Sequence, residues 1–279
     1  EAKAGGWAIG HFNFSTADQL KAFVEAAAEM KSPIMVGTSE GEADFVGREQ
    51  TVALVRSYQQ EGHAVFLNAD HHKSWETAKA AIDAGYDTVL IDASKLPFDE
   101  NIVLTKKVVD YAKSLEVEPL KRGSTSVWVE GELGYLLGSS EVQEAVEISV
   151  ADYTKPEEAA EFVTRTGVDR LAVVFGNIHG IVTEQEEHLD IEHLKKIVQA
   201  VPDIPLVLHG ASGLLTEEIK MAIQNGIANV HINTELRVGY KEGLKKGLAL
   251  DEVAPYKFLA PAIADMTAFV AGKMRVFGR

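Results

Sequence analysis

Short apolar runs alternate with longer amphipathic stretches along the whole chain. The runs are rich in β-branched residues and have few polar positions, a pattern typical of strands buried on both faces of a parallel sheet. We predict eight strands, at Ala8–Phe12, Ile34–Thr38, Val65–Ala69, Thr88–Ile91, Val127–Glu130, Leu171–Phe175, Leu206–Leu208 and Val230–Ile232.

The stretches between the strands place their apolar residues at the spacing of amphipathic helices. Several are followed by glycine, as at Gly62, Gly85 and Gly167, a residue common just past helix C-termini. The predicted helices are Thr16–Met30, Gly47–Glu61, Ser74–Ala84, Phe98–Ser114, Pro156–Arg165, Ile191–Ala200 and Thr216–Asn225. Eight strands alternating with helices predict an α/β fold, a (β/α)₈ TIM barrel. Because no linker rich in Pro, Gly or Ser divides the chain, we expect one domain over residues 1–279.

Composition narrows the classes of partner. The formal net charge of −15 argues against binding to nucleic acid or to an anionic membrane, since both need excess Lys and Arg. The chain has no cysteine, so a transition metal would need His, Asp and Glu ligands. It also has no apolar run near the roughly 18–20 residues that span a bilayer, and no signal-peptide pattern. We therefore expect a cytoplasmic protein.

Polar residues follow every predicted strand. In a TIM barrel the C-terminal ends of the strands meet at one mouth, where active sites are built. The residues at these ends are Asn13, Ser39, Asp70, His71, His72, Asp92, Glu130, Glu132, His179, His209, Ser212, Asn233 and Thr234. We therefore expect the active site at this face.

Three histidines at separate strand ends suggest a metal centre. His71, His179 and His209 match a catalytic zinc, which has three protein ligands and an open position for substrate. One such histidine alone would more often be structural, but the convergence of three favours a metal. His72 is ambiguous, since in an extended chain it points away from His71. We expect structural or solvated roles for His11, His63, His188 and His193.

Glycines flank two of these histidines, in the segments GNIHG and HGASG. Gly180 and Gly210 permit close backbone approach, so their N–H groups can cradle a phosphate, aided by the hydroxyls of Ser212 and Thr234. Binding through the backbone would let an acidic protein hold an anionic substrate.

These motifs resemble those of the class II fructose-bisphosphate and tagatose-bisphosphate aldolases, in the same order and over nearly the whole chain. The resemblance implies that Asp70 moves the proton at the hexose C4 oxygen. It also implies that zinc held by His71, His179 and His209 polarises the substrate carbonyl. The resemblance also implies an alternative or second metal position at Asp92, Glu130 and Glu132. A monovalent cation is a further candidate ion. The implied substrate contacts are Asn13, Ser39, Gly180, Gly210, Ser212, Asn233 and Thr234.

The segment Gly138–Asp152 follows the fifth strand and is compatible with either a lid over the site or an ordinary surface loop. Its Glu141 is the candidate for the glutamate that moves the C3 proton of the triose, although the family has acids after a glycine pair and this chain reads GSSE. Two further features depart from the family. His231 stands where the family has an asparagine within reach of substrate, and the polar extension Glu118–Ser126 replaces a short loop.

The expected activity is reversible cleavage of a ketose 1,6-bisphosphate, fructose 1,6-bisphosphate first, to dihydroxyacetone phosphate and glyceraldehyde 3-phosphate. Tagatose 1,6-bisphosphate is the alternative, because Asn233 leaves the sugar's C4 stereochemistry open. His231 also supports a second alternative, a non-catalytic relative acting as a binding protein. A Schiff-base aldolase would need a buried lysine at a strand end, and none of the predicted strand ends shows a convincing one. An amidohydrolase-type barrel would need a pair of histidines on its first strand, where His11 is the only histidine. The resemblance implies a homodimer or homotetramer, for which the apolar tail Phe258–Phe277 is the candidate contact.

Overall fold

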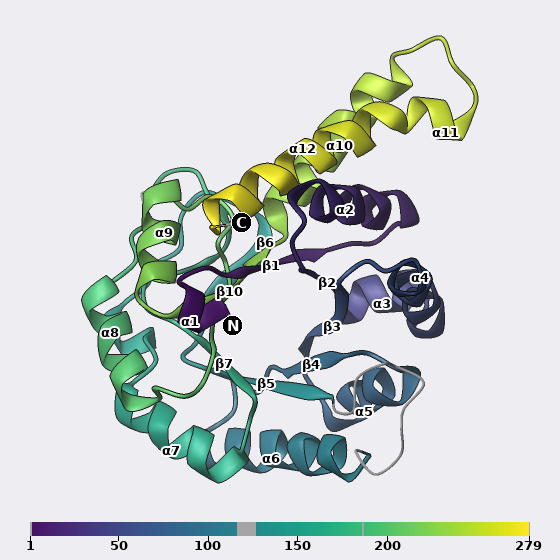
Figure 1. The fold of residues 1–279 in the computed structure, drawn as a ribbon. Coiled ribbons are helices and arrows are strands. Elements are labelled where there is room, and N and C mark those ends of the chain that lie inside the picture. The colour runs from purple at the N-terminus through teal and green to yellow at the C-terminus, as the bar shows by residue number, and fades with distance from the viewer. Residues whose placement is uncertain (1, 116–126, 186, 279) are drawn as a thin grey trace.

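Eight parallel strands close into a barrel with helices around it (Figure 1). The computed structural model describes residues 2–115, 127–185 and 187–278, so the extension at 118–126 lies outside the described residues. The strands neighbour one another in the order β1-β10-β9-β7-β5-β4-β3-β2. Their bounds are β1 Ile9–Asn13, β2 Ile34–Ser39, β3 Val65–His72, β4 Thr88–Ile91, β5 Trp128–Leu133, β7 Arg170–Val173, β9 Leu206–Leu208 and β10 Ile227–Ile232. Each overlaps a predicted strand, and the TIM barrel is confirmed.

Helices pack their apolar faces on the outside of the barrel. Thr16 and Ser74 begin two of them as N-caps, because each hydroxyl accepts the backbone N–H three residues on. Helix α2 (Ala17–Met30) ends at Met30, and Lys31 follows it in the left-handed conformation. The helices that alternate with strands are α2 Ala17–Met30, α4 Arg48–Gln60, α5 Trp75–Ala84, α6 Phe98–Ser114, α7 Pro156–Thr166, α8 Ile191–Ala200 and α9 Thr216–Gln224.

Several elements at the mouth were not predicted. Helix α3 (Glu40–Val46) starts directly after β2, where Ser39 and Glu42 form a capping box. Strand β6 (Gly138–Gln143) pairs in parallel with β8 (His179–Val182) as a separate two-stranded sheet. The segment after the fifth predicted strand is therefore partly a strand, because its backbone pairs with residues about forty positions on. Two further elements that were not predicted are α1 Ala2–Gly5, which precedes the N-terminal end of β1, and a 3₁₀ turn at Val150–Asp152.

The C-terminal helices form an arm beside the barrel. Helices α10 (Thr234–Leu248) and α12 (Ala260–Val276) lie side by side, joined through α11 (Pro255–Phe258), and extend beyond the strands (Figure 1). The tail residues Met266 and Val270 are buried, while the tip of the arm exposes apolar side chains such as that of Val253. No helix among the described residues has the length and apolar content needed to cross a membrane.

Candidate active site

A bulge at the end of β3 turns two consecutive side chains into the barrel mouth. In a regular strand Asp70 and His71 would face opposite sides. Here His71 has a positive φ of 48°, and the pairing of β3 with β4 shifts register between Ala69 and His72. Both Asp70 and His71 consequently line the same cavity. Such a strained non-glycine backbone is often found at functional sites.

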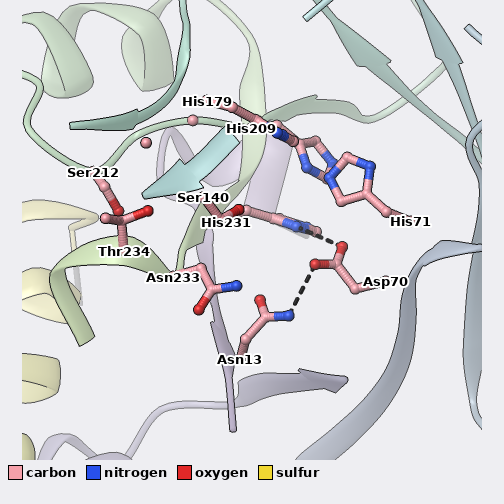
Figure 2. A pocket seen from close by; sticks show the side chains of 12 residues that line it. Asn13, Asp70, His71, Ser140, His179, His209, Ser212, His231, Asn233 and Thr234 are labelled. Carbon is pink, nitrogen blue, oxygen red and sulfur yellow. Dashed lines mark hydrogen bonds and ion pairs between the residues drawn. The ribbon is translucent and has the colours of Figure 1, made fainter. Parts of the chain in front are cut away.

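His71, His179 and His209 converge at this mouth from three segments (Figure 2). The ring centroid of His71 lies 4.8 Å from that of His179 and 4.7 Å from that of His209. One ring nitrogen from each histidine lies within 4.8 Å of the other two. After small side-chain rotations these atoms can reach one ion at the ~2.1 Å distance of a zinc–nitrogen bond. The donor set therefore fits a divalent metal.

Acidic side chains orient two of these rings. Glu130 Oε1 lies 2.8 Å from His209 Nε2, and its other oxygen pairs with Arg170 Nε at 2.5 Å. Asp92 Oδ2 lies 3.1 Å from His71 Nδ1, where Glu132 Oε2 also approaches to 3.4 Å. One nitrogen of each ring therefore remains for a metal, the arrangement common around metal-bound histidines.

The acids implied for a further metal position separate into two groups. Asp92 and Glu132 form a second potential ligand set with His71, whereas Glu130, which also pairs with Arg170, forms another with His209 and His231.

The carboxylates around His71 set the charge of the site. Burial alone would lower the pKa of His71, but Asp70, Asp92 and Glu132 outweigh it and raise that pKa to about 10. Burial, reinforced by the charge of Asp92, raises the pKa of Glu132 well above its usual value. Burial and the charge of His71 lower the pKa of His179. The carboxylates thus favour a positive charge beside them, and a divalent metal bound there would take the place of the His71 proton.

Asp70 is buried and held at both oxygens (Figure 2). Its Oδ2 accepts the Asn13 Nδ2–H at 2.9 Å, and its Oδ1 lies 3.4 Å from His231 Nδ1. Burial would raise the pKa of this carboxyl, but the positive charge of His71 and the contact with His231 hold it well below the usual range. Asp70 is therefore ionised.

Two further histidines, His11 and His231, form a buried cluster with Asp70. His231 lines the cavity, and its ring stacks on that of His11 with centroids 3.6 Å apart. Gly37 makes room, since a Cβ there would lie 2.3 Å from the His11 ring. We expected a structural or solvated His11, and it is buried in this cluster. Side chains alternate between the two faces of a strand, so Asn229 and His231 of β10 share one face. This alternation is the sequence signal that could have identified the cluster.

The glycine segments lie beside the histidines. Gly180 and Gly210 have φ values of +96° and +67°, and a Cβ would come within 2.3 Å of Ser139 O at the first and 2.1 Å of Ile178 O at the second. Ser212 and Thr234 lie side by side at the opposite end of the view from His71 (Figure 2). Thr234 is the first residue of α10, whose N-terminus therefore faces the same cavity. Backbone N–H groups, hydroxyls and a helix N-terminus are the usual partners of a phosphate.

The remaining predicted residues lie in different places. Asn233 lines the cavity, and Ser39 lines a wider adjoining cavity of about 380 Å³ while its hydroxyl caps α3. Glu141 is exposed on β6 and lines neither cavity, whereas its neighbour Ser140 lines both. The structure thus does not bring Glu141 to the other candidate residues, and its role stays a prediction.

Residues that we had not identified from the sequence line or support the wider cavity. Arg237, Lys73 and Lys95 line it, and the buried Glu42 lies between Arg237 and Asn13. These residues follow no apolar run directly, so the strand-end rule could not find them. The capping-box pattern S-x-x-E at Ser39 and Glu42 is the one local signal.

Comparison with known proteins identifies the family. The family model described as "Fructose-bisphosphate aldolase class-II" matches residues 1–279. The fructose-bisphosphate aldolase of Geobacillus stearothermophilus is 38% identical, with 100% of this chain and 94% of that protein covered. The probable fructose-bisphosphate aldolase of Bacillus subtilis strain 168 is 37% identical, with 99% of this chain and 94% of that protein covered. The crystal structure of the YdjI aldolase from Escherichia coli K12 matches with a TM-score of 0.84 and 34% identity, covering 99% of this chain and 94% of that one. The chain therefore belongs to the class II fructose-bisphosphate aldolase family.

Proposed function

We propose that this protein is a zinc-dependent aldolase that reversibly cleaves a ketose 1,6-bisphosphate, with fructose 1,6-bisphosphate as the first candidate. The products would be dihydroxyacetone phosphate and glyceraldehyde 3-phosphate. The observation that carries the proposal is the convergence of His71, His179 and His209 beside both Asp70 and the glycine cradle. Two of the relatives above are named for fructose bisphosphate, which supports the choice of sugar.

The chain's own residues account for binding and for one proton transfer. Gly180, Gly210, Ser212 and Thr234 hold the phosphate of the triose half, which places the sugar carbons over the histidines. Asp70 accepts the proton of the C4 hydroxyl as the C3–C4 bond breaks, so that the C4 oxygen becomes the aldehyde carbonyl. The electron pair of the broken bond stays on the triose half, which then takes a proton at C3. When bound, a divalent metal supplies the Lewis acid that stabilises the negative charge developing there.

Glu141 is our candidate for the C3 proton donor, although its side chain faces outward. Neighbouring residues of a strand face opposite sides, so Ser140 faces the pocket in its place. This assignment therefore requires β6 to change its pairing with β8 during the reaction.

The deciding experiment is a coupled cleavage assay on fructose and tagatose 1,6-bisphosphates, with chelator and then with added zinc. We expect cleavage of one sugar in preference, loss of activity with chelator and recovery with zinc. Cleavage that survives chelation would exclude the metal-dependent reaction. Trapping of a Schiff base between protein and substrate by borohydride would exclude it as well. Absence of cleavage of both sugars at full zinc occupancy would favour the non-catalytic alternative.

A further inference from the structure

An arginine inside the barrel contacts side chains of four other strands. Arg170 is the first residue of β7, and only 4% of its side chain is exposed. Its Nε lies 2.5 Å from Glu130 Oε2 on β5, and its Nη2 donates to Asn68 Oδ1 on β3 at 2.9 Å and to Thr88 Oγ1 on β4 at 3.1 Å. Its Nη1 lies 3.1 Å from Met35 Sδ on β2. Arg170 lines neither of the two cavities at the mouth, so its effect on the reaction passes through these neighbours.

The first branch of these contacts leads to the candidate metal ligand His209. A guanidinium has only donors, so the Glu130 carboxylate beside it serves as an acceptor. Glu130 Oε2 faces Arg170, and Oε1 lies 2.8 Å from His209 Nε2, which therefore carries the proton of its ring. The other ring nitrogen, Nδ1, keeps its lone pair and is free to bind a metal ion. The pairing of Arg170 with Glu130 thus determines which nitrogen of His209 is available.

The second branch leads to the histidine pair beside Asp70. Asn68 must turn its oxygen toward Arg170, and consequently turns its NH₂ group toward His11 Nε2, 3.1 Å away. Burial lowers the pKa of His11 well below its usual value, so the ring is neutral at pH 7. Since its Nε2 accepts, the proton of this neutral ring lies on Nδ1. The Asn68 amide therefore holds His11 in one orientation and one tautomer.

His11 in turn supports the ring that contacts Asp70. It stacks on His231 with ring centroids 3.6 Å and planes 8° apart. His231 is also held at its edge, because Asn229 donates to Ile9 O at 2.8 Å and so turns its oxygen toward His231 Nε2, 2.9 Å away. His231 then faces Asp70 Oδ1 with Nδ1, at 3.4 Å. A shift of the His11 ring would consequently move the ring beside Asp70.

We propose that Arg170 is a positioning residue, which sets the tautomer of His209 through Glu130 and the orientation of the histidines beside Asp70 through Asn68. This inference rests on the proposed aldolase function. One buried cation then aligns a metal ligand and the proton-transfer group before the substrate binds. Such preorganisation avoids the cost of ordering these groups during the reaction.

Arg170→Met tests the first branch, because it removes every donor of the guanidinium and keeps a long side chain. Glu130 can then rotate, and the His209 proton is no longer confined to Nε2. We expect the zinc affinity, measured by competition with a chelator, to fall about 10- to 100-fold, as is typical when a partner of a metal-bound histidine is lost. In metal-free protein labelled with ¹⁵N-histidine, the His209 signals, assigned by their loss in His209→Ala, should change from one tautomer to an average of two.

Arg56→Met is the matched control. Arg56 is another largely buried arginine, 16% exposed, whose Nη2 pairs with Asp87 Oδ1 at 2.7 Å and which lines neither cavity. Both variants break a buried arginine–carboxylate pair and should lower the urea midpoint. Only Arg170→Met should weaken zinc binding and mix the His209 tautomers. Wild-type zinc affinity with a single His209 tautomer in Arg170→Met would overturn the proposal, whatever the loss of stability. Arg170→Gln and Arg56→Gln allow the same comparison where Arg170→Met does not fold.

Asn68→Leu and Arg170→Lys test the second branch. Asn68→Leu leaves the Arg170–Glu130 pair in place, so zinc affinity should stay within about twofold while kcat at saturating zinc falls about 10- to 100-fold. Arg170→Lys keeps a charge for Glu130 but loses the planar fork that also reaches Asn68, so it should recover zinc affinity and keep the low kcat. Wild-type kcat in both variants would refute the second branch.

The zinc and tautomer measurements do not depend on cleavage. If Arg170→Met shows the expected loss of zinc affinity but the wild type cleaves no ketose bisphosphate, the proposed function fails while the role of Arg170 at His209 stands. If the wild type cleaves the sugar and Arg170→Met binds zinc with unchanged affinity and one tautomer, the positioning role fails and the proposed function stands.

Discussion

Asp70 and His71 are neighbours in the chain, yet the structure gives them different surroundings. The Asp70 carboxylate is held between Asn13 and His231, whereas His71 faces the other histidines and the acids Asp92 and Glu132. A proton-transfer group needs a defined orientation near the substrate, and a metal ligand needs carboxylates behind it. At the scale of single residues, the bulge in β3 gives the two residues of one dipeptide these two kinds of surroundings.

Asp70→Ala should be nearly inactive even at saturating zinc. A lost general acid or base costs ~10²–10⁴ in turnover and leaves metal affinity nearly unchanged. This is tested by measuring the cleavage rate of the variant over a zinc titration. Exchange of the triose phosphate C3 proton with solvent should persist in the same variant.

Asp92→Ala is the comparison for Asp70→Ala. Because Asp92 orients His71, its loss should cost ~10–100-fold in metal affinity or activity and be partly rescued by zinc. Recovery of Asp70→Ala to near wild-type rates with added zinc would assign Asp70 the same supporting role.

Glu187 should make stability depend on pH. Its carboxyl accepts the Ile178 N–H at 2.7 Å, and burial raises its pKa from 4.5 to about 8. The folded protein therefore keeps this proton after the unfolded chain has lost it, so the stabilising contribution is complete below pH 4.5 and is lost as the pH rises to about 8. Relative to Glu187→Gln, which cannot ionise, the wild type should lose unfolding free energy across this window. Urea unfolding at about pH 5, 7 and 9 measures the difference, and a constant difference would contradict the assignment.

At the scale of elements, the two-stranded sheet of β6 and β8 forms one wall of the site. Gln143 connects the two strands, since its Nε2 donates to His179 O at 2.7 Å and its Oε1 accepts the Ser139 N–H at 3.2 Å. The backbone of a candidate metal ligand is thus held by a side chain of the opposite strand. This pairing also places Ser140 at the pocket and Glu141 outside it.

Gln143→Ala should loosen β6 without unfolding the barrel. We expect faster amide hydrogen exchange over residues 138–143 and a slower cleavage rate, with an unchanged urea midpoint. Val142→Ala is a suitable control because Val142 is 55% exposed on the same strand. Equal exchange rates in the two variants would show that Gln143 does not hold this sheet together.

At the scale of the whole molecule, barrel closure brings together histidines that are distant in the chain. The apolar core that closes the barrel is extensive and includes none of these histidines. We therefore expect folding to be independent of the metal, while the metal binds the finished site and stabilises it by mass action.

Zinc should raise the melting temperature of the wild type by several degrees, since a ligand at ~100 times its Kd adds about 2.7 kcal/mol. Chelation should abolish cleavage but leave the circular dichroism spectrum of the barrel unchanged. His209→Ala should lose both the zinc stoichiometry and the thermal shift, whereas His188→Ala, at an exposed histidine outside the cluster, should retain them. Full zinc occupancy in His209→Ala would rule out the proposed ligand set.

The barrel and the position of its site could be derived from local patterns. Apolar runs, helical periodicity and N-caps such as Thr16 and Ser74 depend on residues a few positions apart, so they can be recognised in the sequence. The rule that strand C-termini share one mouth then brought Asp70, His71, His179 and His209 together. The family resemblance supplied the proposed chemistry.

Side-chain directions and long-range partners depended on the folded chain. The bulge that turns His71 inward, the β6–β8 pairing that leaves Glu141 outside, and the contact of Glu130 with Arg170 all involve segments remote in sequence. The hydrogen bonds of Glu42 with Asn13 and with Arg237 join residues that are 29 and 195 positions apart. Local periodicity determines which face of an element is apolar, but the register and packing of the closed barrel determine which polar groups meet across it.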